Sequence, residues 1–189
     1  MLAEPANRGL FQYSDPTQFF LGYLKEKQRR KEARHFGKEI AQYLQTSGLF
    51  KDRSWASIKV EELTDVQCVG FLWAVYVSLY RHFRQSVAPC AMQCLESEIF
   101  FHRRPEALQA IANFFGIELS DAELGGILVN PVFDRHAKQL SRAFDLAERE
   151  AEYQRLSEAL KDEVAEGLEW ISDLLGESGH ALPLPGSCL

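Results

Sequence analysis

The stretch TDVQCVGFLWAVYVSLYRHF, residues 64–83, decides the fold class. It opens with Thr64 three positions before Gln67, which is the form of a capping box at a helix N-terminus. The residues that follow are apolar nearly all round, and a fully apolar run extends from Cys68 to Val77. A helix without a polar stripe is buried on every side. This segment therefore predicts a central core helix, because the apolar run is only about half as long as a membrane span.

Upstream of this segment, the sequence predicts a short strand followed by helices. The apolar run Gly9–Tyr13 has the length of a strand, and Asp15-Pro16 reads as a helix start, with Asp15 as the cap and Pro16 at the first helical position. We expect this helix to continue through the basic stretch 25–34 and to break at Gly37. The basic stretch is either a solvated helix face or a surface for an anionic ligand.

Downstream, the sequence predicts a second strand over residues 87–95, followed by two helices over residues 105–115 and 120–129. A loop over residues 133–138 and one long acidic helix over residues 145–175 come next, and residues 177–189 form an extended, loosely packed tail. Strands joined by a helical crossover pair in parallel. The expected fold class is therefore mostly α with one to three short parallel strands, in a single domain over residues 1–189.

Charge and cysteine usage narrow the class of protein. The net charge of −6 argues against a nucleic-acid binder, which normally has a basic face. The four cysteines include a C-x3-C pair, Cys90 and Cys94, without the second pair that a zinc site needs. We expect buried thiols in a reducing cytoplasm, and a disulfide bridge stays open as the alternative. The N-terminus lacks the pattern of a signal peptide, so a cytoplasmic location is expected.

The ordered features from residue 91 to residue 138 resemble the C-terminal part of the P-loop sulfotransferases, in particular a bacterial branch. The segments that carry the likeness are Leu95–Phe100, Pro105–Leu108, Phe114–Ile117 and Pro131–Lys138, the last being similar to the family's Phe-x-Arg-His-Ser-Lys segment. Upstream, Leu10–Asp15 with Phe19, Phe20 and Lys25 is similar to the strand and helix that carry the family's 3′-phosphate site. The tail segment Leu182–Pro185 also has a counterpart in that branch.

The resemblance implies a cofactor and a set of residues that bind it. Sulfotransferases move a sulfuryl group from 3′-phosphoadenosine 5′-phosphosulfate to a hydroxyl or an amine. Carried over by position, the cofactor-binding candidates are Arg135, His136, Lys138, Ser14 and Lys25. Ser14 stands where the better-known branch has an arginine, so it supplies a hydrogen bond without the charge. The residue pattern alone favours an alternative interpretation, in which Arg135 and Lys138 form ion pairs with nearby acids and His136 caps the loop.

The loop that would cradle the phosphosulfate is missing from the sequence. A Gly-rich loop at a helix N-terminus holds such anions, and the chain has neither G-x-x-x-x-G-K-[ST] nor a family-type equivalent. No metal-ligand spacing or catalytic set stands out, so the catalytic residues are unassigned and turnover by this chain alone is not expected. Two hypotheses follow: a half sulfotransferase that is inactive alone and either needs an N-terminal partner chain or represents a decayed gene product, and a helical interaction module without catalytic activity. We expect the isolated chain to self-associate as a twofold homodimer.

Overall fold

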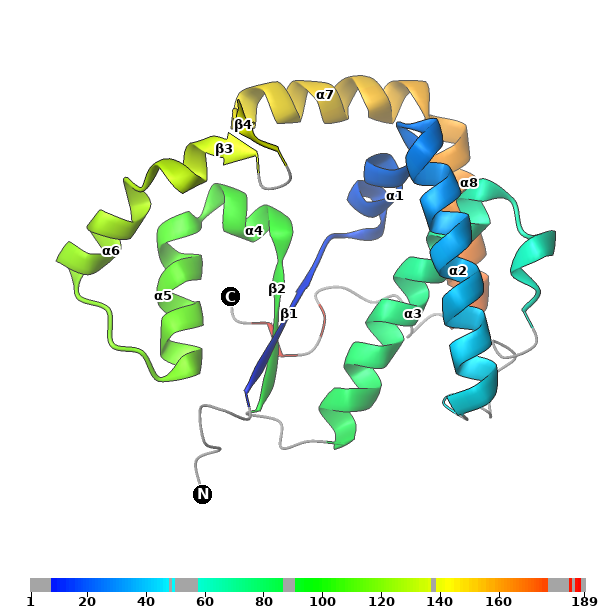
Figure 1. Cartoon of the computed structure of the whole chain (residues 1–189), viewed down its shortest axis with the longest axis horizontal. Helices are drawn as coiled ribbons and strands as arrows, with labels where there is room; N and C mark the ends of the chain where they lie inside the picture. Colours follow the sequence, from blue (N-terminus) through cyan, green and yellow to red (C-terminus); the bar gives the residue numbers. More distant parts are fainter. Residues whose placement is uncertain are drawn as a thin grey trace. The chain divides into compact units, whose positions relative to one another are not determined.

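The computed structural model describes residues 8–47, 49, 58–86, 91–136, 139–176, 184 and 186–187, and for residues 136 and 139–142 it describes the backbone. The contacts divide the chain into two compact units. We call residues 1–14, 80–153 and 182–189 the sheet unit, and residues 15–79 and 154–181 the helical unit. Helices dominate the described residues, and the sheet unit holds a two-stranded parallel sheet (Figure 1). This confirms the prediction of a mostly α chain with short parallel strands.

The helical unit contains helices α1, α2 and α8, a 3-10 helix, most of α3 and the end of α7. Their bounds are α1 Pro16–Leu24, α2 Lys27–Ser47, the 3-10 helix Val60–Glu62, α3 Asp65–Ser86, α7 Leu146–Ala159 and α8 Lys161–Leu175. Asp15 caps α1 as expected, with Oδ1 accepting from the Thr17 and Gln18 amides at 2.8 and 3.2 Å. The predicted helix break at Gly37 is wrong, because the break lies after Leu24 and α2 runs through Gly37.

A close contact explains why Gly37 lies inside a helix. A methyl group placed on Gly37 would lie 3.2 Å from Cγ1 of Val60, so the missing side chain lets the 3-10 helix pack directly against α2. The glycine is buried. Glycine costs about 1 kcal/mol relative to alanine in a helix interior, and close packing against Val60 is the compensating gain.

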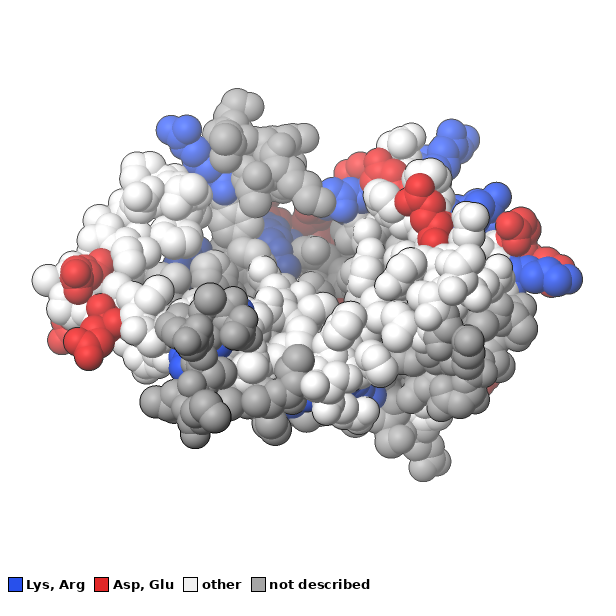
Figure 2. Space-filling view, turned by 60° about the horizontal axis from the view of Figure 1, so that its bottom comes forward, with Lys and Arg blue, Asp and Glu red and all other residues white. Residues whose placement is uncertain are grey.

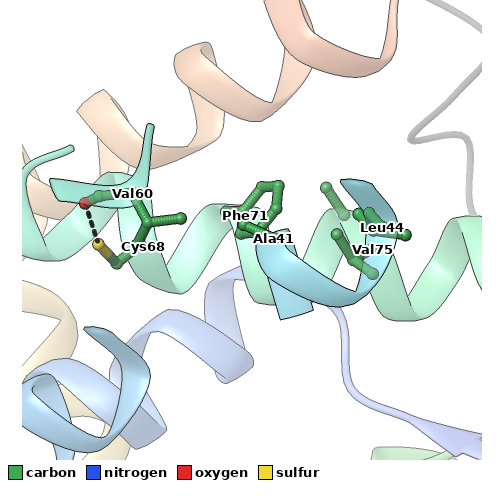
Figure 3. Close-up of a cluster of buried hydrophobic side chains, with 7 residues drawn as sticks. Ala41, Leu44, Val60, Cys68, Phe71 and Val75 are labelled. Atoms are coloured by element: carbon green, nitrogen blue, oxygen red, sulfur yellow. Dashed lines mark hydrogen bonds between the residues drawn. The ribbon is translucent and has the colours of Figure 1, made fainter. Parts of the chain in front are cut away.

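The predicted central helix is α3. Thr64 and Gln67 form the expected capping box, in which each side chain accepts from the other residue's amide at 3.2 and 3.0 Å. Nearly every side chain from Val66 to Val77 is buried, and Trp73 is only 2% exposed. Figure 3 shows the cluster that α3 forms with α2 and with the 3-10 helix. Its members are Ala41, Leu44, Val60, Cys68, Phe71, Ala74 and Val75.

The predicted single helix over residues 145–175 is two helices, α7 and α8. Leu160 separates them with φ −113° and ψ 14°, outside the helical region. Beyond Leu160, α8 packs with two glycines at the contact. A methyl group on Gly167 would lie 2.5 Å from the Phe20 ring, and one on Gly70 would lie 2.8 Å from Cγ2 of Ile171. Close packing against α1 and α3 therefore determines the direction of α8. The spacing of apolar residues alone did not indicate that α8 is separate from α7.

In the sheet unit, β1 (Gly9–Tyr13) and β2 (Met92–Glu96) lie side by side in the same direction (Figure 1). The register pairs Gly9 with Met92 and Tyr13 with Glu96 without a bulge. The parallel pairing confirms the expectation for strands joined by a helical crossover. Strand β2 lies over the predicted stretch 87–95, in which Pro89 left the start open, and it runs from Met92 to Glu96. Residues 87–90 lie outside the described residues.

In the described part of the chain between β2 and α7 there are three helices, a 3-10 helix and a hairpin. They are α4 Ser97–His102, α5 Arg104–Phe115, α6 Asp121–Leu128, the 3-10 helix Pro131–Asp134, β3 Arg135–His136 and β4 Gln139–Ala143. The predicted loop over residues 133–138 is therefore wrong for residues 133–136. Strands β3 and β4 are antiparallel, which departs from the expected all-parallel set. The two residues between them are too few for the crossover that parallel strands need.

The described part of the tail packs against β2. Leu184 is 1% exposed, and the amide of Cys94 donates to the carbonyl of Gly186 at 3.0 Å. Ser187 forms a parallel bridge with Cys94. At these residues the tail is docked, in contrast to the loose packing that its composition indicates. Cys68 and Cys94 are free, buried thiols as predicted, while Cys90 and Cys188 lie outside the described residues.

Candidate ligand site at the carboxyl ends of the parallel strands

The carboxyl ends of β1 and β2 bring hydroxyl and amide side chains together. Ser97 Oγ donates to the carbonyl of Tyr13 at 2.9 Å, although the two residues are 84 positions apart. Ser14 Oγ lies 3.4 Å from Ser97 Oγ, and Gln12 Nε2 donates to the same oxygen at 3.3 Å. In open α/β sheets, ligands bind at this end of parallel strands. The arrangement is therefore the candidate ligand site of the sheet unit, and it includes the predicted residue Ser14.

The hydrogen bonds assign different roles to the two serines. Ser97 directs its single proton to Tyr13, and its oxygen accepts from Gln12 and from Ser14. A serine hydroxyl has one proton and two lone pairs, so Ser97 is fully used in holding the two strand ends together. The hydroxyl of Ser14 points to Ser97 and can turn toward a ligand oxygen by rotation about one bond. Ser97 is a positioning residue that sequence reasoning missed, since nothing local marks it.

The first turn of α1 is not available to a phosphate. Its amides at Thr17 and Gln18 are already bound to the carboxylate of Asp15. A helix N-terminus attracts anions through such unpaired amides, and here the chain supplies its own anion. An anionic ligand near Ser14 would therefore need its positive partners from elsewhere.

The predicted cationic residues lie in three places. Arg135 begins β3 and is exposed, and among the described residues it forms no ion pair with Asp134 or Glu96. His136 follows in β3, where its backbone pairs with Gln139. Lys138 lies outside the described residues. Lys25 occupies the C-cap position of α1 and belongs to the helical unit, whereas Ser14 and Arg135 belong to the sheet unit.

Two arginines of the predicted basic stretch are engaged in ion pairs inside the helical unit. Arg30 binds the carboxylate of Glu163 in α8 with two nitrogens, at 2.5 and 3.2 Å. Arg34 binds Asp65 at the start of α3, at 2.8 Å. On the face of the helical unit in Figure 2, basic and acidic side chains are interspersed. These pairs favour the structural reading of the stretch over a surface for an anionic ligand.

An arginine clamp lies beside the strand ends and was not predicted. The guanidinium of Arg149 donates to both carboxylate oxygens of Glu98, one residue after Ser97. Its guanidinium carbon also lies over the rings of Phe101 and Tyr153, at 4.5 and 4.6 Å from their centroids. Burial lowers the pKa of Arg149, but the hydrogen bond and charge of Glu98 outweigh it and hold the pKa above its usual value. The clamp joins α4 to α7 and fixes the helix that follows Ser97.

The surroundings of the buried Cys94 disfavour its thiolate form. Burial raises the pKa of its thiol, and burial likewise raises the pKa of Tyr80, to which Cys94 is hydrogen-bonded. The thiolate is the reactive form of cysteine, and this environment disfavours it. Cys94 and Tyr80 instead belong to the packing that surrounds β2, where the Tyr80 ring stacks on Phe11 at 4.9 Å.

Within the described ranges, no three His, Cys, Asp or Glu side chains are grouped as a metal site would require. Among the same residues, no helix combines the length and apolar character that crossing a membrane requires. Comparisons of the chain with models of protein families, with curated proteins and with solved structures find no match.

Proposed function

We propose that the chain is a sulfotransferase-like protein that binds an adenosine 3′,5′-bisphosphate-type ligand and does not transfer sulfuryl groups by itself. The observation that carries the proposal is the in-register parallel pairing of β1 with β2, which places Ser14 beside Ser97 at the carboxyl ends of the strands. The resemblance assigns the 3′-phosphate site to this strand and helix. The ligand is therefore the nucleotide product or the intact phosphosulfate donor.

The charge for a phosphate has to come from cationic residues. Arginine and lysine balance the negative charge of a phosphate and also donate hydrogen bonds to it, whereas Ser14 donates a hydrogen bond without a positive charge. Arg135, His136 and Lys138 supply the charge in this proposal. The exposed Arg135, which forms no ion pair with the acids described around it, supports this assignment.

A complete enzyme would need the Gly-rich loop from another chain. We propose that an N-terminal partner chain supplies this loop, because a second copy of this chain would lack it as well. We also propose that the chain forms a homodimer and that it works in the cytoplasm. Buried thiols such as Cys68 and Cys94 stay reduced in that compartment.

Binding of adenosine 3′,5′-bisphosphate, measured by titration calorimetry, tests the ligand assignment. We expect binding by the wild type and at least tenfold weaker binding of adenosine 5′-monophosphate, because a charged hydrogen bond contributes about 1.5–3 kcal/mol. Arg135→Ala should weaken bisphosphate binding about tenfold or more, by the loss of one such bond. Ser14→Ala should also weaken it about tenfold or more, since a hydrogen bond to a charged phosphate contributes about 1.5–3 kcal/mol.

The matched control is Ser157→Ala, which removes an exposed hydroxyl from α7 and should leave the affinity unchanged. The proposal is wrong if the wild type does not bind the bisphosphate at millimolar concentration. It is equally wrong if Arg135→Ala and Ser157→Ala bind alike.

We expect no sulfuryl transfer from the phosphosulfate donor to a panel of phenols and alcohols by the isolated chain. The missing loop would supply preorganised amide donors, and one such donor is worth about 10²–10³ in rate at comparable sites. Product formation is measured by transfer of ³⁵S from the labelled donor. Donor-dependent turnover that Arg135→Ala abolishes would contradict the prediction and make the chain an enzyme.

One observation favours the second candidate, a helical interaction module. Phe36 and Tyr43 of α2 are 42% and 56% exposed, and seven residues of spacing place them on the same helix face. Aromatic residues are enriched where proteins bind partners. If the chain binds no bisphosphate and Phe36→Ala/Tyr43→Ala abolishes binding to a partner protein, this candidate replaces the first.

A further inference from the structure

The two strands of the parallel sheet direct their backbone groups to alternate sides. The amide of Gly9 donates to the carbonyl of Ala91 at 2.8 Å, so Gly9 faces β2. Along a strand paired in parallel, successive residues turn their N–H and C=O groups to opposite edges. The backbone N–H and C=O groups of Phe11 therefore also point toward β2, whereas those of Leu10 and Gln12 point to the outer edge of β1.

The outer edge of β2 is covered by the chain itself. The carbonyl of Met92 accepts from Nη1 of Arg84 at 2.6 Å, and the amide of Cys94 donates to Gly186 at 3.0 Å. Ser187 continues this contact as a parallel bridge to Cys94. A methyl group on Gly186 would lie 2.0 Å from Arg84, so the tail is fitted closely to this edge. One edge of the sheet is thus closed by internal contacts.

The outer edge of β1 is open by comparison. In the part of the chain that the structure describes, no strand pairs with this edge, and no hydrogen bond is made by the outward backbone groups of Leu10 and Gln12. Natural proteins protect an open edge with charged residues, proline or a bulge. The strand GLFQY has no charge and no proline, and its register is regular. It lacks the features that prevent edge-to-edge pairing.

We propose that the outer edge of β1 pairs with β1 of a second copy of the chain, antiparallel about a twofold axis at Phe11. In that register, Leu10 of each copy lies opposite Gln12 of the other. The outward groups of the two residues match as a hydrogen-bonded pair, so the four residues form four backbone hydrogen bonds. Phe11 then faces its own equivalent, a cross-strand aromatic pair of the kind that stabilises sheets.

The lack of charge in β1 supports a second copy of the chain as the partner at this edge. Like charges directly opposite each other destabilise a strand pair, and a neutral strand that meets itself places none there. Twofold dimers are the commonest oligomers, and they require a surface that is complementary to itself. The pattern of Leu10 and Gln12 around Phe11 meets that requirement. This proposal concerns a contact between copies and does not depend on the ligand of the proposed function.

Light scattering and hydrogen exchange on the whole wild-type chain test the proposal. We expect the mass to rise from 21.6 kDa toward twice that value across micromolar concentrations. The amides of Leu10 and Gln12 should become protected from exchange over the same range, whereas the amides of Phe11 and Tyr13 are protected throughout. A mass that stays at 21.6 kDa, or edge amides that exchange freely in the dimer, would overturn the proposal.

Gln12→Pro tests the edge by mutation. Proline at an edge position removes a donor without affecting the inner ladder, so β1–β2 pairing stays while two intermolecular bonds are lost. Association should weaken about thirtyfold or more, from the typical net contribution of two hydrogen bonds. Gln12→Ala is the matched control, because it keeps the amide and should dimerise like the wild type. If Gln12→Pro is folded by circular dichroism and still dimerises like the wild type, the contact lies elsewhere.

Discussion

Phe20→Ala is expected to lower the free energy of unfolding of the helical unit by about 3–5 kcal/mol, the range for removing a buried aromatic side chain. Phe20 is 0% exposed, and its ring fills the space left by two glycines, Gly70 in α3 and Gly167 in α8. Removal of the ring leaves a cavity where three helices meet. Urea denaturation followed by far-ultraviolet circular dichroism measures the loss.

The contact with Gly167 makes the prediction specific. A methyl group at Gly167 would lie 2.5 Å from two atoms of the Phe20 ring, so Gly167→Ala should destabilise by about 1–3 kcal/mol through overpacking. The cost appears although alanine is the better helix former by about 1 kcal/mol. In the Phe20→Ala background the ring is gone and only Cγ2 of Val66, at 2.8 Å, stays close to the added methyl group, so Gly167→Ala should cost less than in the wild type. The double-mutant cycle should show a coupling of at least about 1 kcal/mol.

Gly22→Ala in α1 is the control for this cycle. A methyl group there meets nothing within 4 Å, so the substitution should be neutral or stabilise by up to about 1 kcal/mol through helix propensity. Additive effects of Phe20→Ala and Gly167→Ala would mean that the two residues do not pack against each other. That result would contradict the described arrangement of α1 and α8.

Trp73→Ala should destabilise the chain by about 3–5 kcal/mol for the same physical reason. Trp73 is 2% exposed and lies in the most buried stretch of α3. Tyr43→Ala removes an aromatic side chain that is 56% exposed and should change stability by less than about 1 kcal/mol. Equal losses from the two substitutions would show that Trp73 is not in the core. Because the chain has two units, unfolding is followed by two probes to test for a single transition.

Features set by neighbouring residues were predicted well from the sequence. The capping box of Thr64 and Gln67 and the cap at Asp15 are present as predicted. Each depends on side chains within three or four positions of the backbone groups that they satisfy. Such signals can be read without knowing the fold.

Helix boundaries that depend on distant packing were predicted poorly. The sequence predicted a helix break at Gly37, because glycine is a poor helix former. The contact with Val60 that favours glycine there cannot be inferred from the neighbouring residues. The spacing of apolar residues across Leu160 is continuous, so it gave no sign that α7 and α8 are separate. The local preference for helix is weak at Gly37 and strong around Leu160. In both places the local preference did not decide the outcome, because packing against other elements can override it.

The sequence by itself determined the mostly α class, the buried core helix α3 and the parallel pairing of two short strands, because apolar spacing and crossover length are enough for these. Only the tertiary structure decided which side chains meet at the strand ends. Ser14 meets Ser97, and Arg149 binds Glu98, across separations of 83 and 51 residues. Contacts over such separations follow from how helices and strands pack, and no local pattern encodes them. Packing therefore brings the residues of the candidate site together, and of these residues the sequence predicted Ser14.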